Sequence, residues 1–249
     1  MIFFFPGVSY LNPKFILYFA WYYGFYVIIR GPSYLLASLS LPLTLLFMVY
    51  IFSHGTLIAF AIAGGPIAIV ASNSINGAAD AAFFRLQIRI QDLFVATSIS
   101  SQDYMLALSL SYLVFSLPGI VLYAFMGAYL GVFTLSSALP IVGVLVLLTL
   151  TVSNLSFIIA GLLKHIRNVW GITSILSIIM TVLPPTFYPF SFLPKIAIYA
   201  LSVSPVTPAA ILMQGLVRLE PLQISMIFIL IFETVILTVL GRRFIRWRE

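Results

Sequence analysis

The stretch Arg85–Tyr104, RLQIRIQDLFVATSISSQDY, decides how this chain is organised. It carries two arginines, two aspartates and three glutamines, whereas the segments on either side, Leu57–Phe84 and Met105–Leu130, are long and apolar. Charged and amide side chains need water, and both flanking segments exceed the ~20 residues with which an apolar helix crosses a bilayer. We therefore expect a solvated segment that joins two membrane spans. Its large apolar residues suggest that it contacts a partner.

The composition of the chain indicates that lipid is its solvent. Of 249 residues, 62% are hydrophobic and 7% are charged, and the mean hydropathy is +1.17. A soluble domain is about 25% charged, and a single core cannot remove this much apolar surface from water. The chain has no cysteine, which excludes disulfides and thiolate sites. We expect one all-α integral membrane domain over residues 1–249. Because Met1–Tyr10 lacks a basic residue and contains Pro6, we expect no cleavable signal peptide.

The distribution of charge predicts the topology. Six segments are expected to span the membrane, namely residues 33–52, 57–84, 105–130, 138–163, 169–189 and 222–240. The loops on one side carry ten of the twelve basic residues: Lys14, Arg30, Arg85, Arg89, Lys164, Arg167, Arg242, Arg243, Arg246 and Arg248. The other side carries Lys195 and Arg218. Since basic loops stay in the cytoplasm, we expect a multi-pass plasma-membrane protein whose two termini, including the tail 241–249, are cytoplasmic.

Two further segments are expected to enter the membrane without crossing it. Residues 13–30 begin with Asn12 as a helix cap and Pro13 at the first position, and they carry eight aromatic residues. Because Tyr and Trp prefer the headgroup level, this segment is predicted to be an interfacial helix, with a true first span as the alternative. Pro184–Gly215 contains six prolines, and its apolar piece is too short to cross. Residues 190–216 are therefore expected to form an extracellular re-entrant hairpin of short helices.

No catalytic constellation is recognisable in the sequence. The chain contains neither GxxxxGK[ST] nor HExxH, so it has no phosphate-binding loop and no zinc-protease motif. The predicted topology places its two histidines, His54 and His165, on opposite faces of the membrane, which disfavours a two-histidine metal site or a serine–histidine pair. We expect a non-catalytic chain that holds no cofactor or metal.

The order of these features resembles the membrane subunit of ABC exporters of the ABC-2 type, the class of drug-resistance and lipid-exporting permeases. The resemblance covers nearly the whole chain and lies in four parts: the helix Pro13–Arg30, a cytoplasmic helix at Phe83–Ala96, the turn Ala96–Ser100, and the proline-rich Phe190–Gly215. In that last part, Leu193-Pro194-Lys195 and Ser204-Pro205-Val206-Thr207-Pro208 look like the family's extracellular re-entrant region. The chain departs from the family where an acidic–basic pair and a Gly-Thr step often precede the coupling helix, because Phe84-Arg85 stands there.

This resemblance implies an assembly and a mechanism. Two permease copies, identical or related, would form the substrate pathway in the bilayer, and separate P-loop ABC ATPase subunits would bind ATP and Mg. The ATPases would act on each permease through the loop 85–103. The residues expected to make that contact are Arg85, Leu86, Arg89, Ile90, Asp92, Leu93 and Phe94.

The spacing within this loop suggests how the contact is made. Leu86, Ile90 and Phe94 recur every four residues and would share one face of a helix. That face could fill a cleft in the partner, surrounded by the charges of Arg85, Arg89 and Asp92. The alternative is an amphipathic helix that rests on lipid headgroups.

Polar residues within the spans are candidates for the substrate pathway. Asn73, Asn76 and Asp80 lie on one face of the second span and could line an inward-facing cavity. Glu233 lies about 12 Å deep in the last span, at 1.5 Å per residue. A carboxylate at that depth marks either a pathway or helix contact, or a structural hydrogen bond to a residue such as Asn154.

Aromatic residues cluster at the outer end of the fifth span. Phe187, Tyr188, Phe190 and Phe192 could form an apolar extracellular gate, and an interface belt is the alternative. The competing class of function is an ion- or proton-coupled secondary transporter or channel with six spans, whose coupling charges would be Glu233 and Asp80. An intramembrane enzyme is disfavoured by the missing catalytic groups.

Overall fold

The computed structural model describes residues 11–245 of the chain. The N-terminal ten residues, for which no signal peptide is expected, and tail residues 246–249, with Arg246 and Arg248, lie outside the described part. The helices are α1 (Pro13–Ala20), η1 (Trp21–Tyr26), α2 (Val27–Arg30), α3 (Pro32–Phe52), α4 (Ile58–Phe83), η2 (Phe84–Ile88), α5 (Ile90–Val95), α6 (Ser101–Tyr129), α7 (Leu135–Leu162), α8 (Ile166–Val182), η3 (Phe190–Phe192), α9 (Lys195–Leu201), α10 (Val206–Leu216) and α11 (Ser225–Phe244). Residues 11–245 contain no strand, which confirms the predicted all-α class.

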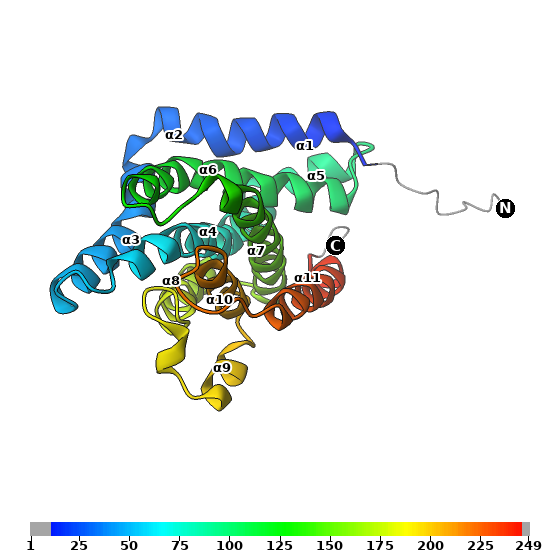
Figure 1. Ribbon diagram of the computed structural model, residues 1–249. Coiled ribbons are helices and arrows are strands. Elements are labelled where there is room, and N and C mark those ends of the chain that lie inside the picture. The colour runs from blue at the N-terminus through cyan, green and yellow to red at the C-terminus, as the bar shows by residue number, and fades with distance from the viewer. Residues whose placement is uncertain (1–10, 246–249) are drawn as a thin grey trace.

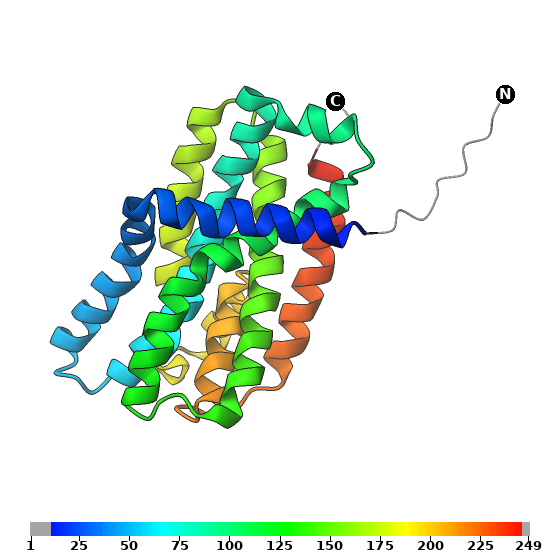
Figure 2. The same ribbon diagram turned by 90° about the horizontal axis from the view of Figure 1, so that it is seen from above.

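Five of these helices are long and apolar enough to cross a membrane, namely α3, α4, α6, α7 and α11. Helices α4, α6, α7, α8 and α11 pack into one bundle, and the rod formed by α1, η1 and α2 lies across it (Figure 2). Helix α8 occupies the segment predicted as the fifth span, but it has 17 residues. Pro184 and Pro185 follow closely and cannot continue a helix.

Helix α4 is the centre of the bundle. It packs against α3, α6, α7, α8 and α10 (Figure 1), and 83% of its most apolar stretch is buried. This close approach requires small residues, because a Cβ at Gly65 would overlap the ring of Tyr123, and one at Gly77 would overlap the ring of Tyr112. Small residues at helix contacts drive packing in lipid, where hydrophobicity alone does not bring helices together.

Helix α3 stands apart from the other spans. Only 6% of its most apolar stretch is buried. Leu45, Leu46 and Val49 near the turn to α4 pack against a small core cluster, and Leu39 lies beside Gly119 of α6. An apolar helix with so little protein contact needs lipid around most of its surface. Within the protein its main contacts are with α4, α2 and α6.

The segment predicted as an interfacial helix is a nearly continuous rod from Pro13 to Arg30. The Asn12 side chain accepts a hydrogen bond from the Phe15 N–H at 3.1 Å and caps its first turn. The Asn12 N–H donates to the Asp103 carboxylate at 2.7 Å, which fixes the start of α1 to the start of α6. The rod ends at Gly31, and Pro32 begins α3.

The proline-rich region forms two short helices with different surroundings. Helix α9 lies outside the bundle (Figure 1), whereas every residue of α10 from Val206 to Gly215 is buried. Helix α10 contacts α4, α7 and α11. It therefore fills the interior of one end of the bundle.

Helices α7 and α11 are joined by a ladder of polar contacts. The hydroxyls of Thr151 and Thr234 lie 2.5 Å apart, and about one turn further on the Asn154 amide donates to the Thr238 hydroxyl at 2.9 Å. Each such bond between membrane helices stabilises their contact by about 0.6 kcal/mol. At the last turn Gly161 lies against the Phe244 carbonyl, where a Cβ would overlap it.

Candidate functional site

The segment after α4, predicted to be one helix, is broken at Arg89. The backbone continues from α4 through the π-helical turn η2, and Arg89 then adopts a left-handed conformation with φ of 54°. Helix α5 starts on the next residue in a new direction. Residues before and after Arg89 therefore do not keep helical spacing, and the prediction that Leu86, Ile90 and Phe94 share one exposed face is wrong.

Phe94 and Ile90 point into the protein instead. The Phe94 ring meets those of Phe15 at 5.2 Å, Tyr104 at 5.9 Å and Phe19 at 6.1 Å. Ile90 packs against the same core cluster. These contacts exist because the rod of α1 lies beside α5 (Figure 1) and presents its aromatic residues to it. The two side chains are thus unavailable to fill a cleft in a partner.

A different apolar set is exposed on this segment. Leu86 is 37% exposed, Ile88 50% and Leu93 67%. The exposed charged residues Arg89 and Asp92 lie between them in the sequence. We call these five residues the tip surface. It keeps the composition of a docking site, with apolar residues beside both signs of charge.

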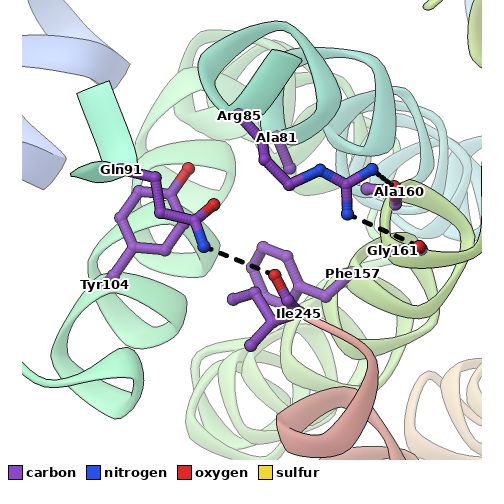
Figure 3. A pocket seen from close by; sticks show the side chains of 8 residues that line it. All are labelled: Ala81, Arg85, Gln91, Tyr104, Phe157, Ala160, Gly161 and Ile245. Atoms are coloured by element: carbon purple, nitrogen blue, oxygen red, sulfur yellow. Dashed lines mark hydrogen bonds between the residues drawn. The ribbon is translucent and has the colours of Figure 1, made fainter. Parts of the chain in front are cut away.

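Arg85 binds the protein itself. Its guanidinium donates to the carbonyls of Ala160 at 2.7 Å and Gly161 at 3.4 Å (Figure 3). It also donates to the Leu163 carbonyl at 2.9 Å. These groups end α7, where carbonyls lack partners within the helix and the helix dipole favours a cation. Arg85 therefore joins the segment that carries the tip surface to the end of α7. The sequence predicted Arg85 at the rim of a docking site and did not reveal this role.

The remaining lining of this joint is closely packed. Figure 3 shows the Gln91 amide directed at the Ile245 carbonyl, to which it donates at 3.4 Å, and the rings of Tyr104 and Phe157 close by. The cavity among these groups measures about 10 Å³, near the lower limit for a single water. The joint therefore connects α4, α5, α6, α7 and α11 mechanically and has no room for a ligand.

Replacing Arg85 by glutamine should lower the free energy of unfolding by about 2–3 kcal/mol, because hydrogen bonds from a charged donor to otherwise unpaired carbonyls are lost. Thermal unfolding of the purified protein in detergent measures this. Arg89→Gln is the matched control, since Arg89 is exposed and surface changes stay within about 0.5 kcal/mol. If the two variants were equally stable, the hydrogen bonds of Arg85 to the end of α7 would not stabilise the fold as proposed.

The polar residues of α4 do not form one lining stripe. Asn73 is buried and donates to the Ser116 hydroxyl of α6 at 2.9 Å. Asn76 is the one exposed side chain among residues 61–79, all of which the structure describes. Asp80 is half-buried near Tyr23 of the rod; burial raises the pKa of the Tyr23 phenol, and the Asp80 carboxyl raises it further. Only Asn76 and Asp80 keep exposed surface.

Glu233 is a half-buried carboxyl on α11. Its Oε2 atom is buried and has no hydrogen-bond partner in the described part of the chain. The predicted bond to Asn154 is wrong, because the Asn154 amide donates to the Leu150 carbonyl at 2.8 Å and to Thr238. A carboxyl without a partner at membrane depth is costly and is commonly functional.

The aromatic residues of the predicted gate are not gathered together. Phe187 packs with Ala61 and Ala68 of α4, and Phe190 lies in the main core. The Tyr188 hydroxyl donates to the Leu183 carbonyl at 2.7 Å, whereas Phe192 is 67% exposed. Phe187 and Phe190 therefore hold the loop in place.

Gln214 of α10 organises this loop, and sequence reasoning missed it. The side chain is 1% exposed. Its oxygen accepts from the Phe190 N–H at 3.1 Å, and its nitrogen donates to the carbonyls of Pro185 at 2.6 Å and Tyr188 at 2.9 Å. The only signal in the sequence was an amide among the apolar residues of 206–216, which does not reveal its partners.

The structure offers no group of three or more His, Cys, Asp or Glu side chains that could hold a metal within residues 11–245. His54 lies in the turn between α3 and α4, and His165 lies between α7 and α8. These turns are at opposite ends of the bundle (Figure 2).

No protein-family model matches the chain, and a search of curated proteins gave no match. The class of the protein therefore follows from its own structure. Residues 11–245 are all-helical, and five of their helices have the length and composition of membrane spans, as expected of a helical membrane protein.

Proposed function

We propose that the chain is the transmembrane subunit of an ATP-driven exporter of the ABC-2 type. In this proposal α3, α4, α6, α7, α8 and α11 are the six spans, both termini are cytoplasmic in the plasma membrane, and two copies form the pathway. Separate ATPase subunits bind ATP and Mg and dock on the tip surface. Support comes from the order of parts: a rod across the bundle, a short helix between the second and third spans, and two short helices before the last.

The tip surface is the observation on which this proposal depends. Leu86, Ile88 and Leu93 are exposed on a segment that Arg85 and the Phe94 contacts attach firmly to the bundle. A soluble partner that binds there would act on α4, α7 and the rod together. A segment that only rested on headgroups would not need such an anchor.

Helix α8 serves as the fifth span in this assignment. Its 17 residues measure about 26 Å at 1.5 Å per residue, close to the ~30 Å hydrocarbon core. Its buried residues are Val169, Thr173, Ser177, Met180 and Thr181, and α8 packs against α4. The exposed remainder includes Ile175 and Ile178. This remainder is available to lipid or to a second copy, and Asn76 and Asp80 would face the pathway between copies.

The topology is tested by labelling single cysteines in intact cells, which is clean because the chain has none of its own. We expect an impermeant maleimide to label Lys195→Cys from outside and to label Arg89→Cys only after the membrane is opened. Copurification of a P-loop ATPase and ATP-dependent export would establish the class. Labelling of Arg89→Cys from outside would overturn both the topology and the docking proposal.

An ion- or proton-coupled transporter is the second candidate, and Glu233 favours it. The carboxyl has no hydrogen-bond partner for Oε2 in residues 11–245, as expected of a group that binds an exchangeable ion. Glu233→Gln should then abolish proton- or sodium-driven uptake in liposomes of the purified protein. In the exporter the same variant should leave ATP-dependent transport within about twofold, because the uncharged amide also removes a desolvation cost.

A further inference from the structure

A groove between α6, α7 and α11 has no role in the exporter proposal. It measures about 240 Å³ and contains none of the residues assigned to the tip surface or the pathway. Met105, Leu106 and Leu150 form apolar walls, and Gln102 and Arg242 supply polar groups at one end. Ser109, Asn154 and Thr238 also line the groove, and the last two are hydrogen-bonded to each other. A site that is apolar on one side and basic at one end suits an amphiphilic anion.

The charge in this groove is one-sided. Arg242 is exposed, and no ion pair to it is found among residues 11–245. None of the lining residues is acidic. The nearest acid along α6, Asp103, is occupied elsewhere, since it accepts from the Asn12 N–H at 2.7 Å and from the Ser100 N–H at 2.9 Å. Within residues 11–245, the lining of the site therefore offers no counter-charge for Arg242.

The groove also lies at the level of the aromatic rod, which the sequence predicts to lie among the lipid headgroups. Leu11, which lines it, directly precedes the cap of α1, and the Asn12–Asp103 hydrogen bond fixes that end of the rod beside the start of α6. The aromatic rod crosses the bundle at this level (Figure 2), and Tyr and Trp of this kind settle at the headgroups. Arg242 in the last turn of α11 is thus placed to meet phosphate.

We propose that this groove binds one anionic phospholipid, with its phosphate at Arg242 and Gln102 and its acyl chains along Met105, Leu106 and Leu150. A guanidinium binds phosphate with two hydrogen bonds and carries little hydration. Basic pockets between membrane helices at this level recognise such headgroups. The inference requires only that the protein is in a bilayer, so it stands or falls independently of the exporter proposal.

The test measures lipid binding directly, by native mass spectrometry of the purified full-length protein in a neutral detergent. We expect phosphatidylglycerol to bind about tenfold more tightly than phosphatidylcholine, since one charge-assisted contact is worth about that factor. Arg242→Gln should remove this preference. Arg243→Gln is the matched control, because the adjacent Arg243 is exposed and does not line the groove, and it should retain the preference.

A second variant keeps the proposal testable if Arg242→Gln proves unstable. Gln102→Glu places a negative charge beside the expected phosphate and should weaken phosphatidylglycerol binding about as much, without affecting phosphatidylcholine. Equal loss in the Arg242→Gln and Arg243→Gln variants would overturn the site, because general surface charge would then explain the binding. Displacement of phosphatidylglycerol by millimolar inorganic phosphate would also overturn it, in favour of a free-anion site.

Discussion

Replacing Ile88 and Leu93 together by aspartate is expected to abolish docking of the proposed partner ATPase. Both side chains are at least half exposed on the tip surface, so their replacement leaves the fold intact. In the docked state each new carboxylate would be buried without a partner, which costs several kcal/mol. Affinity in pull-down should fall by roughly 100-fold or more. ATP-driven export should fall to background, while the ATPase keeps its own basal hydrolysis.

The matched control adds the same charge to the same loop at a different place. Ala96 and Ser98 are exposed and carry no large apolar group, so Ala96→Asp with Ser98→Asp should retain most binding and export. A tip variant that binds the ATPase as tightly as the wild type would reject the docking site. Equal loss in both double variants would mean that the loop responds to charge alone, which would reject the assignment of Ile88 and Leu93.

Replacing Gln214 by leucine should strongly lower the free energy of unfolding. The side chain serves the Phe190 N–H and two carbonyls inside the protein, and each buried group left unpaired costs about 1–3 kcal/mol. We expect a loss of about 3–5 kcal/mol and a fall in melting temperature of about 10 °C. Thermal unfolding in detergent, followed by circular dichroism, measures both the shift and the retained helix content.

The neighbouring Met213 provides the control for this experiment. It is as deeply buried as Gln214, and Met213→Leu introduces the same residue without removing a hydrogen bond. Such volume-conserving changes cost less than about 1.5 kcal/mol. If the two variants have the same melting temperature, the hydrogen bonds of the Gln214 amide do not hold the loop that carries Pro185, Tyr188 and Phe190.

The ends of most helices could be predicted from the sequence because local chemistry determines them. Asn12 and Pro13 begin the rod, and Gly31 with Pro32 separates it from α3, as residue type alone suggests. Helix α6 begins four residues before the predicted start, since the Ser100–Asp103 capping box starts it at Ser101. Residues 101–104 were too polar to be assigned to a span by hydropathy.

The orientation of side chains could not be predicted in the same way, because it depends on contacts between distant segments. No glycine or proline marks the break at Arg89, so the sequence predicted one continuous helix from Leu86 to Phe94. The rod, some 75 residues earlier in the sequence, is what Phe94 contacts. Arg85 and Gln214 likewise bind backbone carbonyls, which every residue carries and which leave no trace in a sequence.

The aromatic contacts between Phe94 and the rod have a mechanical consequence. Helix α5 cannot tilt without displacing Phe15 and Phe19, and the rod behind them reaches Gly31, the pivot at which α3 begins. A force applied at the tip surface would thus be carried along the rod, across the bundle, to the start of α3. In that arrangement α3, the membrane-length helix with the smallest buried share, is the one that we expect to move.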